Sequence, residues 1–340
     1  MKIRLLSKSS CYVYIICALF SINLYTFELY AFELGLPLEL PIDCKPGDNC
    51  FIQNYFDREP GIAVRDYTCG FLSYNGHKGT DFRISWADMH NGAAVKAAAS
   101  GRVKAIRNNM QDINVRKIGF DAIKGKEAGN GVVIEHKNGW ETQYSHLKKG
   151  SIRVKPGDKV KAGQVLGLVG LSGKTEFPHL DMQVRFKGKA LCPFAGLTDS
   201  AGCGIKKKSL WDPNVLKTLT YVPTGVIAKG FSSVVPDMES ALKGEYISKS
   251  FSKHSPAIVF WVVVFGVQKG DEESLKIVDP DGRVFAEYRG IIEKTQAQRF
   301  RFVGKKLKGR VLVKGKYIGS YKLIRKTGEI ISSQYTVKIL

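Results

Sequence analysis

The stretch QVLGLV at Gln164–Val169 indicates the fold class, together with two similar runs, AVKA at Ala94–Ala97 and GVVI at Gly131–Ile134. Short runs of aliphatic and β-branched residues between glycine or Pro-Gly turns are typical of strands in an all-β domain. The tripeptide Pro156-Gly157-Asp158 supplies one such turn. We therefore expect residues 71–195 to form a β domain built from short strands.

The second half of the chain has the same character. Its expected strands are Ala257–Val267, which is a continuous apolar run, Arg299–Phe302, and Val311–Leu323 with turns at Gly315 and Gly319. The first of these is too short to cross a bilayer and is better explained as a buried strand. Residues 224–340 are therefore predicted to form a smaller accessory domain that resembles a β-sandwich, with 196–223 as a linker.

Composition and charge exclude some classes of protein. The chain has 340 residues, enough for about two domains. Its 44% apolar and 24% charged residues are ordinary for a folded protein and argue against a disordered one. The formal net charge is +21, and such a protein is drawn to polyanions: nucleic acid, an anionic lipid surface or an acidic cell-wall polymer.

The amino terminus narrows that choice. Basic residues precede an apolar run over residues 11–27, and a small residue, Ala31, follows it. This is the layout of a secretory signal, although an uncleaved anchor at 1–31 stays open. We therefore expect export to the periplasm or cell envelope, which argues against nucleic acid as a partner and limits membrane contact to this segment. Residues 32–70, punctuated by prolines, are predicted to be irregular.

Five cysteines lie beyond the expected signal, and an exported protein should pair most of them. Cys192 and Cys203 are close in sequence around a glycine-rich loop, so we predict this bridge first. A second bridge would join two of Cys44, Cys50 and Cys69, because connectivity does not follow from spacing. No Cys-x-x-Cys pair is present, which argues against a structural zinc cluster.

Histidines and aspartates suggest a metal-dependent hydrolytic site. His77 and Asp81 are four residues apart, His146 ends an expected strand, and alternation places His179 and Asp181 on one strand face. A hydrolytic zinc site needs about three nitrogen or oxygen ligands. It also needs a base that the metal does not use. His77, Asp81 and Asp181 can supply the ligands, and His146 and His179 the remaining functions. Each segment alone occurs by chance, but their combination in one domain is informative.

These segments, in their order, resemble the lysostaphin/LytM-type metallopeptidases over residues 70–195. The matching stretches are Gly76–Asp81, Gly129–His136, Tyr144–Leu147, Val160–Gly167 and Pro178–Leu180. The resemblance implies a small antiparallel β domain (a duplicated hybrid motif) with one zinc ion that cuts peptides in bacterial peptidoglycan. It further implies that His77 and Asp81 bind zinc, while His146 and His179 orient the attacking water and stabilise the oxyanion.

Asp181 departs from the family pattern, which has His-x-His here and uses the second His as the third zinc ligand. A carboxylate can bind zinc at a similar distance, but it is shorter and harder than imidazole. A His/Asp/Asp set should weaken zinc binding or favour harder divalent metals such as manganese.

Three functional hypotheses follow. The first is an active zinc endopeptidase that acts on peptidoglycan. The second is a catalytically degenerate domain that binds the wall or regulates a peptidoglycan amidase, since a fold does not fix a function. Other cell-wall enzymes would then be partners. A secreted binder of nucleic acid or membrane is the third, but the sequence has no matching motif.

Overall fold

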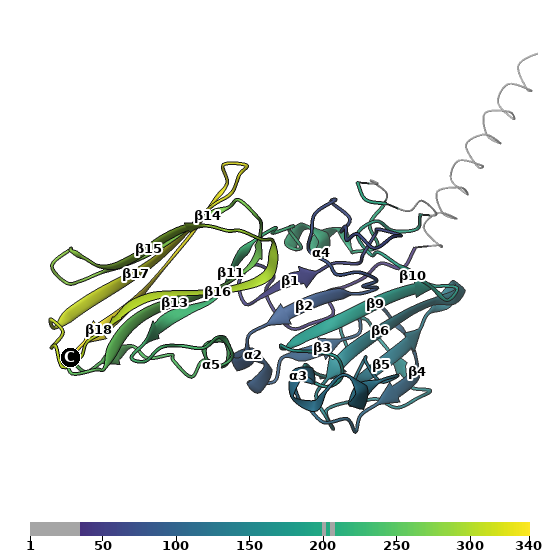
Figure 1. Cartoon of the computed structure of the whole chain (residues 1–340). Coiled ribbons are helices and arrows are strands. Elements are labelled where there is room, and N and C mark those ends of the chain that lie inside the picture. Colours follow the sequence, from purple (N-terminus) through teal and green to yellow (C-terminus); the bar gives the residue numbers. More distant parts are fainter. Residues whose placement is uncertain (1–34, 199–201, 205–207) are drawn as a thin grey trace, which may run out of the picture.

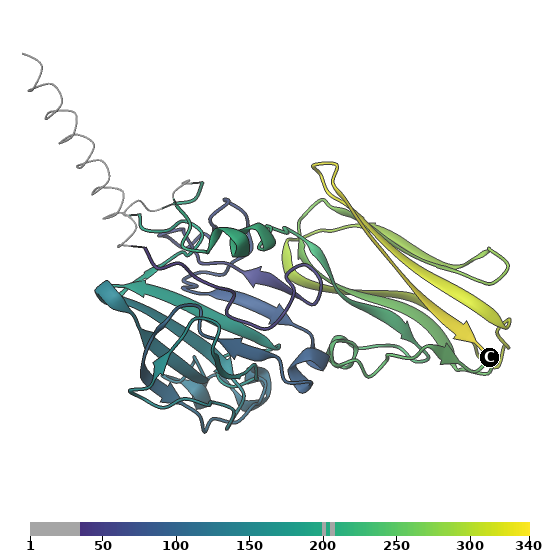
Figure 2. The ribbon, with the colours of Figure 1, turned by 180° about the vertical axis from the view of Figure 1, so that it is seen from behind.

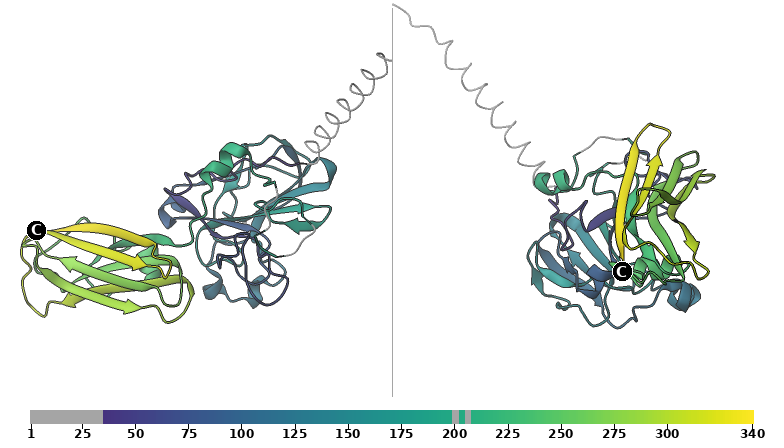
Figure 3. Two further views of the ribbon diagram at one scale, coloured as in Figure 1. Left: turned by 90° about the horizontal axis from the view of Figure 1, so that it is seen from above. Right: turned by 90° about the vertical axis from the view of Figure 1, so that its left-hand side faces the viewer.

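The computed structural model describes residues 35–198, 202–204 and 208–340. The predicted signal or anchor at 1–31, which contains Cys11 and Cys17, lies outside these residues. Two β bodies lie side by side in the front, rear and top views (Figures 1, 2 and 3). In the part of the chain that is described, no helix has the length and apolar character needed to cross a membrane.

The first body is built on an eight-stranded antiparallel sheet in the order β1-β2-β9-β6-β5-β4-β7, with β10 added beside β9. Its strands are β1 (Cys50–Asn54), β2 (Thr80–Ile84), β4 (Gly101–Arg107), β5 (Asn130–Glu135), β6 (Trp140–Leu147), β7 (Lys159–Val160), β9 (His179–Phe186) and β10 (Lys189–Leu191). A separate pair joins β3 (Ala94–Lys96) to β8 (Val165–Leu168). The all-β fold is confirmed, and the three quoted runs are the strands β3, β5 and β8.

Alternation along the central strands decides which side faces the core. Leu180, Met182 and Val184 of β9 are buried in the hydrophobic core of this body. His179 and Asp181 therefore share the opposite face of the strand, as the alternation predicts. On the neighbouring strand β2, Phe82 and Ile84 also enter the core, so Asp81 faces the same way as Asp181.

The short helices lie at the edges of the two bodies. They are α2 (Trp86–His90), α3 (Val115–Ile118), α4 (Pro213–Thr218) and α5 (Met238–Lys243), with single 3₁₀ turns η1 (Asp121–Ile123) and η2 (Lys137–Gly139). Asp237 caps α5 by accepting a hydrogen bond from the backbone N–H of Ser240, and Gly244 ends it in the left-handed conformation. This capping fixes a short helix beside α2, which belongs to the first body (Figure 1).

The second body consists of two sheets packed face to face. One contains β11 (Gly225–Ser232), β13 (Ala257–Val267) and β16 (Gln296–Lys306); the other contains β12 (Ser250–Phe251), β18 (Ile330–Ile339), β17 (Gly315–Ile324), β14 (Glu272–Val278) and β15 (Val284–Ile291). Residues from both sheets share one core, in which Phe260 of β13 and Tyr317 of β17 are buried. The expected buried strand at Ala257–Val267 is β13.

Gly319 differs from the sequence prediction, because it lies inside β17 and not in a turn. A Cβ atom at this position would lie 2.3 Å from Cδ2 of Phe260. The glycine therefore makes room for an aromatic ring from the opposite sheet. Gly315, the other predicted turn, is the first residue of the strand.

The region 32–70 is not wholly irregular, since β1 pairs with β2 along the edge of the main sheet. A disulfide joins Cys44 to Cys50 at the start of β1, and this bridge agrees with the second predicted pairing. The first predicted bridge, Cys192–Cys203, is wrong. Cys203 is bonded to Cys69, 134 residues away, and Cys192 is a buried free thiol. Proximity in sequence failed because the fold brings the Cα atoms of Cys69 and Cys203 to 5.0 Å.

Candidate metal centre

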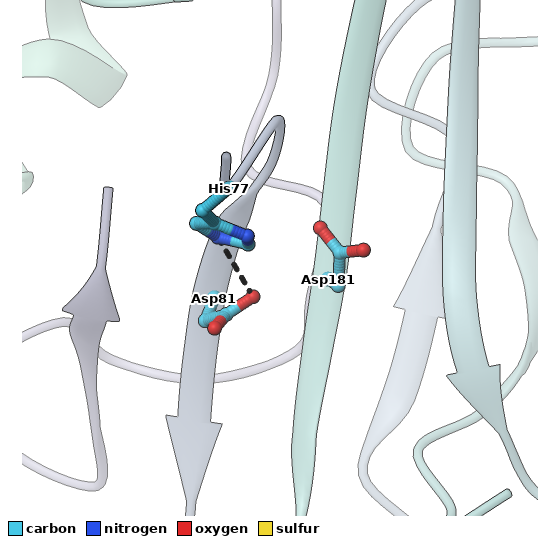
Figure 4. Close-up of side chains that lie close together, drawn as sticks. All are labelled: His77, Asp81 and Asp181. Atoms are coloured by element: carbon cyan, nitrogen blue, oxygen red, sulfur yellow. Dashed lines mark ion pairs between the residues drawn. The ribbon is translucent and has the colours of Figure 1, made fainter. Parts of the chain in front are cut away.

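The candidate ligands come from two adjacent strands and the turn before one of them. His77 precedes β2, Asp81 lies in β2, and Asp181 lies directly opposite Asp81 on β9. Directly opposed residues of an antiparallel pair project from the same face. Figure 4 shows the three side chains pointing toward one another, and one ligand atom from each lies within 4.8 Å of the other two.

Each candidate ligand has one atom that the protein leaves without a hydrogen bond. His77 Nε2, Asp81 Oδ1 and Asp181 Oδ1 are buried and have no hydrogen-bond partner among the described residues, although the first two face each other as an ion pair. The second carboxylate oxygens are occupied: Asn54 Nδ2 donates to Asp81 Oδ2 at 2.8 Å, and Gln183 Nε2 donates to Asp181 Oδ2 at 3.0 Å. Buried polar atoms normally have partners, so three unsatisfied atoms that converge indicate a cation site.

The spacing of one pair of these atoms also suits zinc. His77 Nε2 and Asp81 Oδ1 are 3.3 Å apart. Two ligands at about 2.1 Å from a tetrahedral zinc ion are separated by about 3.4 Å. The donor set, one imidazole and two carboxylates, therefore fits a divalent cation in charge, and the His77–Asp81 pair also fits it in spacing.

Gly79 makes room for the third ligand. A Cβ atom at this position would lie 1.7 Å from Asp181 Oδ1. The glycine between His77 and Asp81 therefore lets the carboxylate from β9 approach the backbone of the turn before β2. A side chain here would displace Asp181.

Burial and mutual repulsion set the charges of the cluster. Burial, and then the charge of Asp81, raise the pKa of Asp181 to about 6. Burial also acts on Asp81, but His77 and His179 outweigh it and lower the pKa of Asp81. Burial alone would lower the pKa of His77, yet the carboxylates of Asp81 and Asp181 raise it. A divalent cation would compensate the two buried carboxylates.

The two remaining predicted residues lie beside this cluster. His179 Nε2 is 3.8 Å from Asp81 Oδ1, and the rings of His146 and His179 have centroids 4.7 Å apart. His146 has φ of 65°, a strained value for a residue other than glycine. Such strain, about 1–3 kcal/mol, is common at functional sites. All five predicted residues are thus brought together.

Backbone carbonyls fix the orientation of both histidine rings. His146 Nδ1 lies 2.8 Å from Ser172 O, and His179 Nδ1 lies 2.9 Å from Phe177 O. A carbonyl only accepts, so each Nδ1 carries the proton and donates it. In their neutral forms both rings therefore present Nε2 as an acceptor.

The residues that orient the candidate ligands were not predicted from the sequence. Gln183 lies two positions after Asp181 on the same face of β9, so the alternation used for His179 could have identified it. No strand was predicted around Asn54, so alternation along a strand could not identify this residue. Tyr74, whose ring packs against that of His77 with centroids 4.3 Å apart, was also missed.

The site opens into a cleft of about 630 Å³. Asp81, His146 and His179 line one side of it, so a ligand in the cleft can reach the candidate centre. Tyr74 also lines this cleft.

Comparison with known proteins agrees with this geometry. Residues 75–193 match the model of Peptidase family M23. The chain is 36% identical over 113 residues to the peptidoglycan DD-endopeptidase ShyA of Vibrio cholerae, covering 33% of this chain and 21% of that protein. It is 34% identical over 148 residues to ShyB of the same organism, also named a peptidoglycan DD-endopeptidase, covering 41% of this chain and 29% of that protein. The chain thus spans less than a third of either relative.

Among solved structures, the catalytic domain of lysostaphin from Staphylococcus simulans is 26% identical, with a TM-score of 0.27, covering 41% of this chain and 85% of that one. The matched segment 75–193 contains His77, Asp81, His146, His179 and Asp181. Over this segment, the chain matches peptidase family M23, the lysostaphin/LytM-type metallopeptidases.

Proposed function

We propose that this protein is a zinc-dependent endopeptidase that hydrolyses peptide bonds in bacterial peptidoglycan during cell-wall remodelling. The convergence of three buried ligand atoms without hydrogen-bond partners, beside two histidines with accepting Nε2 atoms, carries the proposal. The names of the Vibrio cholerae relatives, which are peptidoglycan DD-endopeptidases, support the substrate class.

His77, Asp81 and Asp181 would hold the ion. A bound zinc ion supplies Lewis acidity, which lowers the pKa of water and polarises a carbonyl. Asn54 and Gln183 keep one oxygen of each carboxylate turned away, so that the other oxygen remains available. Such outer partners orient ligands and tune the site.

His179 is assigned as the general base. Phe177 O and Thr175 Oγ1 hold its Nδ1 at 2.9 and 3.1 Å, which fixes the ring and leaves Nε2 free to take a proton. A base must lie within hydrogen-bond reach of the proton that it removes. The Nε2 atom of His179 faces Asp81 at 3.8 Å, so it can accept a hydrogen bond from a water that lies close to the ligands.

Of the two roles that the resemblance implies for this histidine pair, we assign His146 the orientation of water and not the stabilisation of the oxyanion. Stabilisation of an oxyanion from Nε2 requires a protonated ring, whereas burial, and then the charge of His179, lower the pKa of His146 to about 3. We assign neutral His146 to accept a hydrogen bond from the attacking water. A water whose two protons point to His146 and His179 directs its lone pairs away from both rings, toward a substrate carbonyl.

The alternative function is a degenerate domain that binds the wall or regulates a peptidoglycan amidase. One observation favours it: Asp181 stands where the family has histidine, and its raised pKa lets a proton compete with the metal. A carboxylate still binds zinc, and manganese would be the harder alternative. Two disulfides accord with an extracytoplasmic location, in the periplasm or cell envelope.

The decisive experiment measures release of new amino groups from purified peptidoglycan by the protein with added zinc or manganese. We expect release that stops with a chelator and returns with metal. Asp81→Asn should abolish release, and His90→Ala, at an exposed position on α2, should not. A folded protein that binds peptidoglycan but releases nothing with either metal would favour the regulatory function.

A further inference from the structure

The cleft at the candidate metal centre has a second wall that comes from outside the M23 segment. Met238, Glu239 and Leu242 of α5 line the same cleft as His146 and His179. So do Ala297 and Gln298 of β16. The sandwich body is therefore part of the surroundings of the site and not a distant appendage.

Several contacts hold this wall in place. Arg83 of β2, only 2% exposed, donates from Nη1 to Gln298 Oε1 at 2.7 Å, and its guanidinium lies 4.3 Å from the ring centroid of Phe177. Arg83 Nη1 also donates to Gln53 Oε1 of β1, so this buried guanidinium bridges β1 and β16, and loss of Gln298 would remove one of its acceptors. The position of β16 relative to the metal-binding strands is therefore fixed close to the site.

Two further contacts join the bodies at either end of this surface. Phe51 of β1 stacks on Phe265 of β13 with ring centroids 4.5 Å apart. Lys117 of α3 forms an ion pair with Glu239 of α5 at 2.7 Å. The stacked rings provide buried apolar contact, whereas the ion pair is exposed and adds little stability of its own.

The cleft continues past the site along the boundary between the bodies. A second cavity of about 260 Å³ shares Gln53, Asn54, Ser73 and Ala297 with the first. Among the described residues, none that lines this second cavity is charged. Amide side chains such as Gln268 and Gln296 lie there beside apolar ones such as Phe71.

This lining suits one class of ligand. Side-chain amides both donate and accept, as peptide groups do, so they can pair with an extended backbone. An uncharged lining disfavours a segment with ionised side chains, which would lose water without gaining a partner. The first cavity differs, since the charged residues Arg116, Lys174 and Glu176 line it beyond the site.

We propose that the C-terminal sandwich forms the second wall of a substrate groove, in which an extended peptide crosses the metal centre and its uncharged stretch occupies the cavity between β1 and β16. This inference rests on the proposed function. The sandwich then selects substrates through the face formed by Met238, Ala297 and Gln298, and the M23 segment alone lacks half of the groove.

Ala297→Trp tests the groove directly. Ala297 is exposed, lines both cavities and has only a methyl side chain, so an indole ring here fills the passage and removes no core contact. The matched control is Val284→Trp on β15, which is 54% exposed and lines neither cavity. Met238→Ala, at a position 39% exposed, removes a wall contact without adding bulk and decides the matter if Ala297→Trp fails to fold.

Two readouts separate this inference from the proposed function. The first is kcat/KM on purified peptidoglycan, and the second is cosedimentation of the metal-stripped full chain with peptidoglycan, which does not require turnover. We expect Ala297→Trp to lower kcat/KM by about tenfold or more, mainly by raising KM, and to lower the affinity measured by cosedimentation by a similar factor. Val284→Trp should leave both quantities unchanged. Met238→Ala should lower both in the same direction.

Equal binding and turnover by Ala297→Trp and Val284→Trp would overturn the groove while leaving the endopeptidase intact. A different result would reject the endopeptidase and keep the groove. In that case the unaltered protein binds peptidoglycan but hydrolyses nothing with either metal, and Ala297→Trp loses the binding. A native chain that neither binds nor hydrolyses peptidoglycan would overturn both.

Discussion

Asn54 Nδ2 donates a hydrogen bond of 2.8 Å to Asp81 Oδ2, while Asp81 Oδ1 lies 3.3 Å from His77 Nε2. Asn54 belongs to β1, which precedes the M23 segment, so an element outside the family match orients a candidate metal ligand. Removing such an outer partner commonly weakens metal binding about 10–100-fold. We expect this loss of zinc affinity in Asn54→Ala, measured by competition with a chelating dye.

The control for this variant is Asn214→Ala, an exposed asparagine in α4 far from the site in sequence. It should bind zinc as the unaltered protein does. If Asn54→Ala retains full zinc affinity while Asp81→Asn loses it, Asn54 has no part in orienting the carboxylate.

Gly79→Ala tests the close approach of Asp181 to the turn before β2. Since the new Cβ would lie 1.7 Å from Asp181 Oδ1, the carboxylate must leave its present position in the ligand cluster. We expect at least about a tenfold loss of zinc affinity with a preserved β circular dichroism spectrum. Gly61→Ala is the control, because its nearest neighbour, Glu59 Oε1, is 3.9 Å from the added carbon. Unchanged zinc binding in Gly79→Ala would contradict the placement of Asp181.

Much of the site follows from local sequence patterns. The alternation of His179, Asp181 and Gln183 along one strand determines which side chains share a face, and the spacing of His77 and Asp81 places both beside one turn. The register that sets Asp81 opposite Asp181 is a long-range property. No periodicity within either strand encodes it, and the motifs predicted a shared site without indicating which residues lie opposite each other.

The features that were wrong or missed share a physical cause. Cys69 pairs with Cys203 across 134 residues, β1 becomes a strand only because β2 offers it a partner, and Gly319 is required by a ring from the opposite sheet. Each depends on contacts between segments far apart in the chain. Local propensity is a weak guide to such contacts.

Asp181→His tests whether the carboxylate occupies the third ligand position. Imidazole suits zinc, and the substitution removes the repulsion between two buried carboxylates. We therefore expect about tenfold tighter zinc binding and weaker manganese binding, both measured by calorimetry. Gln183→Ala is the companion variant: it keeps the carboxylate but removes the amide that donates to Asp181 Oδ2, so zinc binding should weaken. Identical zinc affinity for aspartate and histidine at position 181 would place this residue outside the metal site.

The pH dependence of metal binding follows from the raised pKa values of His77 and Asp181. Both groups must lose a proton to bind the ion, and both hold it to a higher pH than usual when the metal is absent. As the pH falls through the pKa of Asp181, which is about 6, protons compete with the metal and the zinc affinity declines. As pH rises above the pKa of His77, affinity becomes constant.

The measurement is the zinc dissociation constant between about pH 5 and about pH 8, which should fall as pH rises over this range. Asp181→Asn removes one titrating group but retains a carbonyl oxygen. Zinc binding to this variant should therefore release about one proton fewer, and its zinc affinity should depend less steeply on pH. A dissociation constant that stays level across this range in the unaltered protein would mean that neither group titrates on binding.

His179→Ala separates the base from the ligands. His179 Nδ1 is held by Phe177 O, and its Nε2 stays 3.8 Å from Asp81 Oδ1, longer than the 3.3 Å between His77 Nε2 and the same oxygen. We therefore expect the variant to keep its zinc, measured by atomic absorption, while kcat on peptidoglycan falls by about 10²–10⁴-fold. Exposed His90 on α2 provides the control His90→Ala, which should retain both. Loss of zinc from His179→Ala would make His179 a ligand and would transfer the role of base to His146.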